Sequence, residues 1–564
     1  MKYPCTSYRK EGGSTPLLDY TIWDHFRTIA SKFPDNDAVV SLPQNIKLTY
    51  QQLALKVDQF ASGLVALGIK KGDRVGIWST NNLEWIVLQL ATARIGAILV
   101  NINPAYRPSE LAYALKQSQI NCLVTIPSFH TSNYVEMLLK LLPDLSNKHW
   151  NLSQHEDFSS LHAVILYDPA KPENSSKPYE GFLTWRDVEQ SGVSVTTAHL
   201  DDISTKLDPY DPINIQYTSG TTGFPKAVVL THHNILNNAY FSASAMHFSS
   251  TDRLCVPVPF YHCFGMVLSN LLCLSVGATV VIACEHFDPL LVLQAIHGEK
   301  CTGIHGVPTM FIAELEHPRF LEFNLSSLRT GIIAGAPCPP ALMKRIINEL
   351  HCSEILIGYG ETEASPLTHL TSRDDSFDRR VNTVGKNLEH QEVKIISLEN
   401  GQTISCGEIG EICFRGYHIM QGYYNDPEAT HKAIDNKGWL HSGDLGTMDK
   451  DGYVRITGRL KEMIIRGGEN IYPREIEDFI FTHPKVAAVA VFGIPDDYYG
   501  EEIVAWIQPH TKQHITPNEI KEFCHEKIAH FKIPKHIHLV DQFPMTVTGK
   551  IQKFRMKEIT MKKK

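Results

Sequence analysis

The loop Tyr217–Lys226, YTSGTTGFPK, brings together hydroxyl groups, glycines and a lysine. Alternating apolar residues before it and a β-branched run after it predict two flanking strands. The glycines let the backbone approach a ligand closely, the hydroxyls can donate hydrogen bonds, and Lys226 supplies a positive charge. This combination suits the oxygens of a polyphosphate, although its spacing differs from the G-x-x-x-x-G-K-[ST] pattern. The candidate phosphate-binding residues are Thr218, Ser219, Gly220, Thr221, Thr222, Gly223 and Lys226.

Two acidic segments further along the chain have forms that suit ligand binding. Tyr359–Glu363, YGETE, follows an apolar stretch that predicts a buried strand. The carboxyl end of such a strand is where α/β sheets bind ligands, and a carboxylate beside phosphate oxygens is a suitable magnesium environment. Asp444 lies in a turn flanked by glycines, where its carboxylate could accept hydrogen bonds from both hydroxyls of a ribose. Glu361 is expected to be a solvated loop residue.

These loops need a scaffold, and much of the chain alternates helix and strand patterns. Capping signals and periodicity predict helices that open at Thr49, Asn82 and Ser109, the first two ending at Gly68 and Gly96. Strands separated by helices favour mostly parallel sheets covered on both faces. Residues 140–210 are expected to be loops and excursions. The predicted strands are Asp73–Ser79, Ala97–Val100, Cys122–Thr125, Leu254–Val258, Ala278–Ala283, Leu328–Ala334 and Ile355–Gly358.

The best candidate for a domain boundary lies near residue 458, after a stretch rich in turns. Beyond it the pattern predicts a helix from Pro473 to about Thr482, strands over Lys485–Phe492 and Ile503–Gln508, and a helix opened by Thr516. We therefore expect the α/β class, with a large layered α/β domain of mostly parallel sheets over residues 1–457. A small α+β domain is expected over residues 458–564.

Composition excludes several other classes. The net charge of −8 argues against a general nucleic-acid binder, and twelve cysteines without a C-x-x-C pair predict free thiols in a reducing cytoplasm. The apolar stretch Met266–Cys284 is divided by Gly277, so we expect a buried helix and strand rather than a membrane span. The tail Lys557–Lys564 is expected to be a frayed, solvated end, with at most peripheral contact to an anionic membrane.

Seven further motifs occur in the order found in the adenylate-forming (ANL) superfamily, which includes acyl-CoA synthetases, aryl-CoA ligases, firefly-type luciferases and peptide-synthetase adenylation domains. With the hydroxyl-rich loop they span most of the chain, and the sequence is most similar to medium- and long-chain fatty acyl-CoA synthetases, which are AMP-binding enzymes. The motifs are Phe260–Gly265 (FYHCFG), Gly335–Pro337 (GAP), Tyr359–Glu363 (YGETE), Ser442–Gly446 (SGDLG), Gly458–Lys461 (GRLK), Gly467–Asn470 (GGEN) and Thr548–Lys553 (TGKIQK).

The resemblance implies a role for residues in each motif. Thr362 would contact the α-phosphate of ATP, Glu363 would coordinate Mg²⁺, and Lys550 would hold the substrate carboxylate against the α-phosphate, where it offsets their repulsion. The small domain would be mobile, with a hinge at 459–461 centred on Lys461, whereas Lys553 is expected to be a surface lysine. The other implied AMP contacts are Gly335, Ala336, Pro337, Gly358, Tyr359, Gly360, Asp444 and Arg459, and the implied coenzyme A contacts are Gly467, Gly468 and Glu469.

The implied reaction has two steps, in which a carboxylic acid and Mg·ATP give acyl-AMP and pyrophosphate, and coenzyme A then displaces AMP to form a thioester. Phe260–Gly265 lacks the acid that would hold an amino group, which disfavours amino acid substrates. Gly360 stands where acetyl-CoA synthetases carry a tryptophan that closes the acyl pocket, so a medium- to long-chain fatty acid is favoured, with His262 as a wall of the pocket. The alternatives are an aryl-CoA ligase, an acyl-AMP ligase that loads a carrier protein, a luciferase-type oxygenase and a non-catalytic acyl-binding protein.

Overall fold

Three large β-sheets form the body of the protein in a computed structural model that describes residues 5–146, 158–171, 179–218, 225–467, 469–511, 513–525, 527–545 and 551–562. The first has eight strands and is parallel from β10 to β11, with antiparallel partners at one end. In spatial order its strands are β10 (Leu183–Thr184), β9 (Ala163–Leu166), β6 (Cys122–Thr125), β4 (Arg74–Trp78), β5 (Ile98–Ile102), β11 (Pro212–Thr218), β12 (Lys226–Thr231) and β22 (Gly422–Tyr423).

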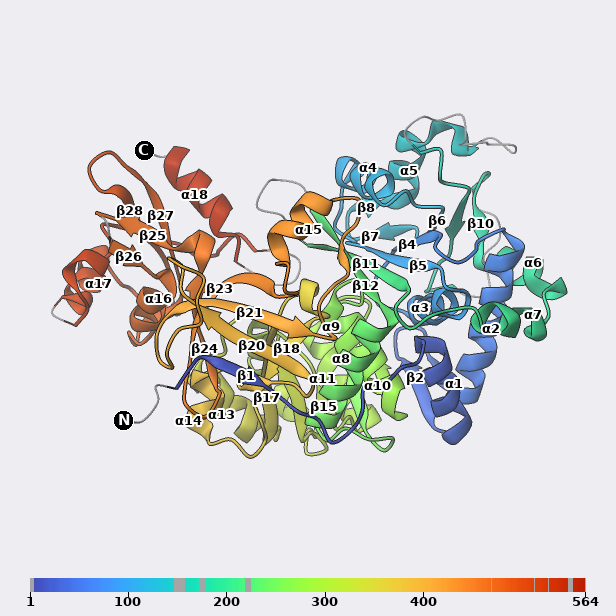
Figure 1. The fold of residues 1–564 in the computed structure, drawn as a ribbon, viewed down its shortest axis with the longest axis horizontal. Helices are drawn as coiled ribbons and strands as arrows, with labels where there is room; N and C mark the ends of the chain where they lie inside the picture. Colours follow the sequence, from blue (N-terminus) through green and yellow to red (C-terminus); the bar gives the residue numbers. More distant parts are fainter. Residues whose placement is uncertain are drawn as a thin grey trace.

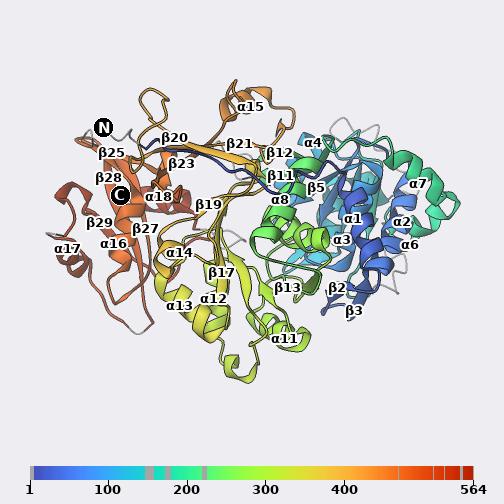
Figure 2. The same ribbon diagram turned by 60° about the horizontal axis from the view of Figure 1, so that its bottom comes forward.

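The second sheet has nine strands, and its central strands from β17 to β2 are parallel. Helices α11 (Pro289–Glu299), α12 (Pro308–Leu315) and α13 (Pro340–Glu349) share an apolar core with it and lie beside it in Figure 2. Its strands are β19 (Lys386–Asn387), β18 (Leu367–Leu370), β17 (Glu354–Gly360), β16 (Thr330–Ile333), β15 (Gly303–Ile304), β13 (Arg253–Cys255), β14 (Thr279–Ile282), β2 (Asp37–Ser41) and β3 (Ile46–Thr49).

The third sheet is wholly antiparallel, whereas the sequence predicted mostly parallel sheets for residues 1–457. Its strands are β1 (Tyr8–Lys10), β20 (Gln391–Ile396), β21 (Gly410–Gly416), β23 (Leu440–Met448) and β24 (Val454–Arg459). The α/β class with mostly parallel sheets is therefore confirmed for the body of the chain, and this sheet is an addition to it.

After β24 the strands form a separate mixed sheet, which Figure 1 shows at one end of the molecule together with α16 (Pro473–Phe481), α17 (Pro517–Cys524) and α18 (Lys553–Lys562). The helix predicted from Pro473 and the helix opened by Thr516 are both confirmed. The strands are β26 (Glu469–Ile471), β25 (Ile464–Arg466), β28 (Gly500–Pro509), β27 (Val486–Asp496) and β29 (His536–Leu539).

Local sequence signals place the helix ends well where a side chain makes the cap. Thr49 and Gln52 form the expected capping box of α2 (Tyr50–Ala66), and Asn82 and Gly96 cap α3 (Leu83–Ile95). Every residue of α3 is buried, as befits a helix packed on all sides. Ser109 was expected to cap the next helix, but the N-cap of α4 (Pro108–Gln117) is Arg107, two residues earlier, since proline favours the first helical position.

The stretch Met266–Cys284 folds as expected into helical segments followed by a strand. A π-helical turn over Met266–Leu271 leads into α10 (Leu272–Val276), Gly277 ends it with a φ of 85°, and β14 follows. Within the described ranges, no helix combines the length and the apolar character that crossing a bilayer would need.

Two segments are more ordered than the sequence indicated. Residues 140–210, expected to be loops, contain β9 and β10, α6 (Trp185–Ser191) and α7 (Thr197–Ser204), because tertiary contacts stabilise elements too short to show a clear period. The tail was expected to fray, but α18 reaches Lys562, since Met556 is buried and Thr560 accepts a hydrogen bond from Trp506 Nε1 at 3.1 Å.

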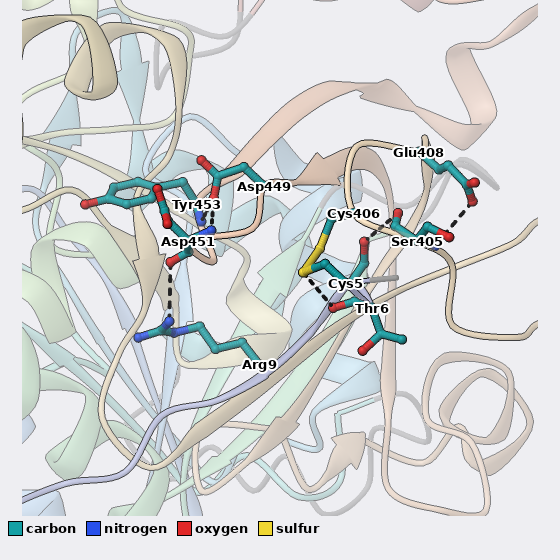
Figure 3. Close-up of a disulfide and its surroundings, with 10 residues drawn as sticks. Cys5, Thr6, Arg9, Ser405, Cys406, Glu408, Asp449, Asp451 and Tyr453 are labelled. Atoms are coloured by element: carbon teal, nitrogen blue, oxygen red, sulfur yellow. Dashed lines mark hydrogen bonds between the residues drawn. A yellow bond between two sulfur atoms is a disulfide. The ribbon is translucent and has the colours of Figure 1, made fainter. Parts of the chain in front are cut away.

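The N-terminal segment is attached to the antiparallel sheet by a disulfide between Cys5 and Cys406, shown in Figure 3. Thr6 bridges to Ser405, and β1 pairs with β20. The expectation that all twelve cysteines are free is wrong for this pair, which lies too far apart in sequence for spacing to reveal it. The other ten are free and buried.

A buried arginine joins two predicted helices, α2 and α3, to the helix α7 that the sequence patterns missed. The side chain of Arg94, on α3, is 1% exposed and pairs with Asp58 of α2 at 3.0 Å and with Asp201 of α7 at 2.7 Å. It also donates to Ser204 Oγ at 2.6 Å. Both carboxylates would lose this desolvated partner together if the guanidinium were removed.

Arg94→Ala is therefore expected to lower the free energy of unfolding by about 3–5 kcal/mol, because it leaves a cavity and unpaired hydrogen-bond groups at a buried site and removes the ion-pair partner of Asp58. Urea denaturation followed by circular dichroism measures the change. Arg27→Ala is the matched control, since Arg27 reaches the same Asp201 at 3.3 Å from a side chain that is 54% exposed. Its expected cost is about 0–1 kcal/mol, and equal costs for the two variants would contradict the burial argument.

Candidate active site

The carboxyl ends of β11 and β17, which belong to different sheets, meet at Glu363. Glu363 lies in a 3₁₀ turn, Thr362–Ala364, which Glu361 joins to the end of β17. Thr218, the last residue of β11, places its Oγ1 3.4 Å from Glu363 Oε1. Tyr423 of β22 donates its hydroxyl to the same oxygen at 2.9 Å. The carboxylate predicted to hold a cation thus sits where three segments converge.

Tyr423 links this carboxylate to the cation at the end of the hydroxyl-rich loop. Lys226 Nζ lies 4.4 Å from the centre of the Tyr423 ring, a cation–π distance. Burial and the neighbouring charge of Glu363 raise the pKa of Tyr423, so its hydroxyl stays a donor at neutral pH. The sequence did not single out Tyr423, because only the pairing of β12 with β22 brings residue 423 beside residue 226.

A second cluster surrounds Asp444 on β23. Tyr359 of β17 donates its hydroxyl to Asp444 Oδ2 at 2.7 Å, and Arg459 Nε lies 3.0 Å from Oδ1. Asp444 and Arg459 are register partners on β23 and β24. Asp444 is only 5% exposed, and burial together with this carboxylate raises the pKa of Tyr359 well above its usual value. The carboxylate is held in a fixed orientation at the junction of two sheets.

Glu361 is not the solvated loop acid that the sequence indicated. Burial and the charges of Glu363 and Asp444 raise the pKa of its carboxyl group well above the usual range. Its Oε1 is buried and has no hydrogen-bond partner among the described residues. The alternation of side chains after β17 turns this residue inward, which a motif of consecutive polar letters does not reveal.

The other nucleotide-site candidates lie at strand ends in the same region. Gly335 follows β16 with a φ of 83°, a conformation that favours glycine, and with Ala336 and Pro337 it is exposed. Gly358 and Gly360 lie within β17. Five loop residues, Ser219, Gly220, Thr221, Thr222 and Gly223, lie outside the described residues, as do Gly468 and Lys550.

The acyl-pocket candidates approach Thr362 from another loop. His262 caps the short helix α9 (Cys263–Gly265), and its Nδ1 accepts from Phe264 N at 3.2 Å. Cys263 Sγ lies 3.6 Å from Thr362 Oγ1, so this loop reaches the turn that carries Glu363. At Gly360 a Cβ would come within 1.8 Å of the carbonyl oxygen of Pro366. The β17–β18 hairpin therefore requires glycine there whatever the size of the acyl pocket.

The motif residues after β24 lie on the C-terminal sheet and the turn before it. Lys461 is in a 3₁₀ turn, Leu460–Glu462, that directly follows Arg459. Gly467 lies in the turn between β25 and β26, and Glu469 is the first residue of β26. Gly467 N donates to the carbonyl oxygen of Tyr499 at 2.8 Å. Glu469 is exposed.

Lys553 is not the surface lysine that was expected. Its Nζ lies 2.8 Å from Glu462 Oε2 and 2.9 Å from Glu477 Oε1. Burial alone would lower its pKa, but the two carboxylates outweigh burial and raise it. The lysine thus ties the start of α18 to the turn that contains Lys461.

Comparison with known families agrees with this geometry over most of the chain. The AMP-binding enzyme family matches residues 26–424, and the AMP-binding enzyme C-terminal domain matches residues 475–550. The protein belongs to the AMP-binding enzyme family.

Relatives of this AMP-binding enzyme cover nearly its whole length. The human mitochondrial medium-chain acyl-CoA ligase ACSF2 is 41% identical over 96% of the chain and 88% of its own length. YngI of Bacillus subtilis, whose assignment as an acyl-CoA synthetase is provisional, is 48% identical over 97% of the chain and 98% of its own length.

Solved structures with the same fold include an anthranilate CoA ligase and a fatty acyl-CoA synthetase. ATP-bound MatB from Rhodopseudomonas palustris has a TM-score of 0.81 at 25% identity, covering 96% of this chain and 99% of its own. A fatty acyl-CoA synthetase from Mycobacterium tuberculosis has a TM-score of 0.72 at 28% identity, covering 96% of this chain and 98% of its own. The anthranilate CoA ligase AuaEII, bound to anthranoyl-AMP, has a TM-score of 0.79 at 25% identity, covering 97% and 98%.

In this AMP-binding enzyme, Asp444→Asn should weaken AMP binding by about 10–100-fold, because hydrogen bonds to a charged acceptor contribute about 1.5–3 kcal/mol. Asparagine keeps the size of the side chain but removes its charge and one acceptor oxygen. Calorimetric titration with AMP measures the affinity. Asp451→Asn makes the same change at an exposed residue whose partner is Arg379, and it should leave AMP affinity unchanged. Unaltered affinity in Asp444→Asn would exclude this carboxylate from the nucleotide site.

Proposed function

We propose that the protein is an ATP-dependent acyl-CoA synthetase that activates a medium- to long-chain fatty acid. The acid and ATP would give acyl-AMP and pyrophosphate, and coenzyme A would then take the acyl group and release AMP. The observation that carries this proposal is that Thr218 and Glu363 meet beyond the carboxyl ends of β11 and β17, while Tyr359 of β17 binds Asp444 of β23, in an AMP-binding enzyme. The relatives that are medium-chain acyl-CoA ligases support the substrate class.

The positions of the candidate residues support distinct roles around ATP. Thr218 and Lys226, at the two ends of the hydroxyl-rich loop, would bind phosphate oxygens together with Ser219, Gly220, Thr221, Thr222 and Gly223. Thr362 would contact the α-phosphate. Asp444 and Arg459 would bind the ribose, beside Gly358, Tyr359 and Gly360, and Gly335, Ala336 and Pro337 would line the adenine.

Lys550 would act on the first step. A carboxylate that attacks the α-phosphate approaches a group of the same charge, so the reaction needs a cation between them. The lysine would attract both groups and stabilise the charge that builds up on the phosphate oxygens. Its removal should therefore affect acyl-AMP formation more than thioester formation.

Glu363 would hold the Mg²⁺ that accompanies ATP. The groups around it fit this ion, because a carboxylate with the hydroxyls of Thr218 and Tyr423 close by is an oxygen-only set. When bound, the ion would neutralise phosphate charge. The residues of this chain would orient it, and Tyr423 would keep the carboxylate in place.

The second step would use a movement of the C-terminal domain. We propose domains over residues 1–457 and 458–564, with a hinge at 459–461 that includes Lys461. The break between β24 and the C-terminal sheet, occupied by a 3₁₀ turn, supports a hinge there. A rotation would withdraw Lys550 and bring Gly467, Gly468 and Glu469 to coenzyme A.

His262 and Gly360 would border the acyl group. An aryl-CoA ligase is the second candidate, because a solved relative is an anthranilate CoA ligase and apolar pockets discriminate weakly. Transfer to a carrier protein is the third candidate.

We also propose a reducing, cytoplasmic location, which the ten free cysteines support. Two observations stand against it: Cys5 and Cys406 form a disulfide, and the human relative is mitochondrial.

The acid is identified by pyrophosphate release with Mg·ATP across C2–C18 fatty acids, benzoate, cinnamates and amino acids, with and without coenzyme A. We expect an optimum between C6 and C18 and turnover that depends on coenzyme A. Turnover only with aromatic acids would establish the aryl-CoA ligase instead. Pyrophosphate release that does not depend on coenzyme A but increases with an acyl carrier protein would establish an acyl-AMP ligase that loads a carrier protein.

Lys550→Ala should slow acyl-AMP formation by about 10²–10³-fold while leaving thioester formation from synthetic acyl-AMP and coenzyme A within about threefold of its normal rate. Single-turnover assays of each half-reaction measure the two rates. Lys562→Ala, on the exposed end of α18, removes the same charge and should change neither rate. Equal loss in both half-reactions would contradict the assigned role.

Chelation of Mg²⁺ with EDTA should stop pyrophosphate release, and added Mg²⁺ should restore it. In Glu363→Gln the Mg²⁺ concentration that gives half-maximal activity should rise at least about tenfold, since a charged oxygen ligand is lost. Glu399→Gln, at an exposed residue, is the charge-matched control. An unchanged Mg²⁺ dependence in Glu363→Gln would assign the ion to other groups.

A further inference from the structure

Three side chains able to bind a metal converge on the antiparallel sheet, outside the cluster around Glu363. Glu411 and Cys413 lie on β21, and His441 lies on the neighbouring strand β23. One ligand atom from each lies within 4.8 Å of the other two. Cys413 and His441 are register partners, and a register shift between Glu411 and Cys413 interrupts the ladder of β21 and β23 at this place.

The distances among these atoms suit a tetrahedral ion. His441 Nδ1 lies 2.9 Å from Glu411 Oε2 and 3.7 Å from Cys413 Sγ. Ligands about 2.0–2.3 Å from a zinc ion stand about 3.3–3.7 Å apart, so small side-chain rotations would bring all three to it. Sulfur, nitrogen and oxygen donors together select zinc over magnesium or calcium.

The surroundings provide a carboxylate near the imidazole and a path from solvent. Asp435 Oδ2 lies 3.9 Å from the other ring nitrogen of His441, and a small shift would let it accept a hydrogen bond from that nitrogen and orient a metal-binding imidazole. The side chain of His441 is 30% exposed and that of Glu411 is 13% exposed, so an ion could enter past the imidazole. Lys394 lies over the ring of the adjacent Trp439, and its charge opposes a cation at this place.

The cluster is attached to the ribose-binding candidate. Glu411 Oε1 accepts a hydrogen bond from Gly443 N at 3.1 Å, and Gly443 directly precedes Asp444. Ser442 Oγ donates to the carbonyl oxygen of Ile412 and accepts from Asp444 N. An ion bound at Glu411 Oε2 would turn this carboxylate and so weaken the hydrogen bond from Gly443 N to Oε1, which helps to orient Asp444.

We propose that Glu411, Cys413 and His441 form a zinc site with water as the fourth ligand, and that bound zinc weakens nucleotide binding through Gly443. When zinc binds, the Cys413 thiol loses its proton to solvent, and the proton that His441 Nδ1 donates to Glu411 Oε2 also leaves to solvent, so that Nδ1 is free to bind the ion. The effect on the nucleotide rests on the proposed function, whereas binding of the ion does not.

Cobalt(II) chloride is the probe for binding, because thiolate-bound Co²⁺ absorbs in the near ultraviolet. We expect a thiolate–Co²⁺ band that saturates at one ion per chain and disappears when zinc chloride displaces the cobalt. In Cys413→Ser the band should be lost, and in His441→Asn the affinity should fall at least about tenfold. Cys524→Ser makes the same thiol-to-hydroxyl change at a buried residue of α17 and should keep the band. Thermal melts confirm that each variant is folded.

A band that persists in Cys413→Ser, or no band in the folded wild-type protein, would overturn the site. The link to the nucleotide is tested by calorimetric titration with AMP, which binds zinc weakly. Saturating zinc should raise the Kd of AMP about threefold to tenfold in the wild-type protein and leave it unchanged in Cys413→Ser. An unchanged Kd in the wild-type protein would overturn the coupling, whereas no AMP binding without zinc would instead contradict the proposed function.

Discussion

Repulsion between carboxylates is the constraint on which this site depends. Glu361, Glu363 and Asp444 lie close enough that the charges of the other two raise the pKa of Glu361. Such a cluster is unfavourable in a partly buried environment unless cations and donors accompany it. The hydroxyls of Tyr423 and Tyr359 and the guanidinium of Arg459 supply part of that compensation. A polyphosphate adds more negative charge, and for this reason the proposed function requires Mg²⁺ and Lys550 as well as the described residues.

The scaffold brings these groups together by joining sheets at their edges. Thr218 ends a strand of one parallel sheet, Glu363 follows a strand of the other, and Asp444 belongs to the antiparallel sheet. Two hydrogen bonds that cross between sheets, from Thr218 to Glu363 and from Tyr359 to Asp444, mark the junction. One apolar core contains residues of all three sheets, so the junction is held rigidly and the donors around each carboxylate must offset its burial.

The sequence predicted the elements whose signals are local and missed those that tertiary contacts create. Thr49, Asn82 and Gly96 mark helix ends because their own side chains or backbone conformations make the caps. The strand β9 has no such mark. The helix α7 does have a capping threonine, Thr196, but its eight residues are too few to show a clear period, and Arg94 stabilises it from more than a hundred positions away. The same distinction applies to the site. Motif letters indicated Glu363 and Asp444, but the inward turn of Glu361, the ion pairs of Lys553 and the place of Tyr423 depend on strand pairings that no short motif contains.

The antiparallel sheet connects the nucleotide site to the proposed hinge more directly than either parallel sheet does. Asp444 and Arg459 face each other in register, and the turn with Lys461 begins at the next residue. A rotation about 459–461 would act first on Arg459 and hence on the ion pair at Asp444, so binding of the ribose and orientation of the C-terminal domain would be coupled through a single salt bridge. The opposite edge of this sheet is fixed by β1 and by the disulfide at Cys406. Movement at β24 would therefore be confined to the hinge and would not spread across the sheet. A C-terminal domain that alternates between two orientations needs such a fixed sheet to rotate against.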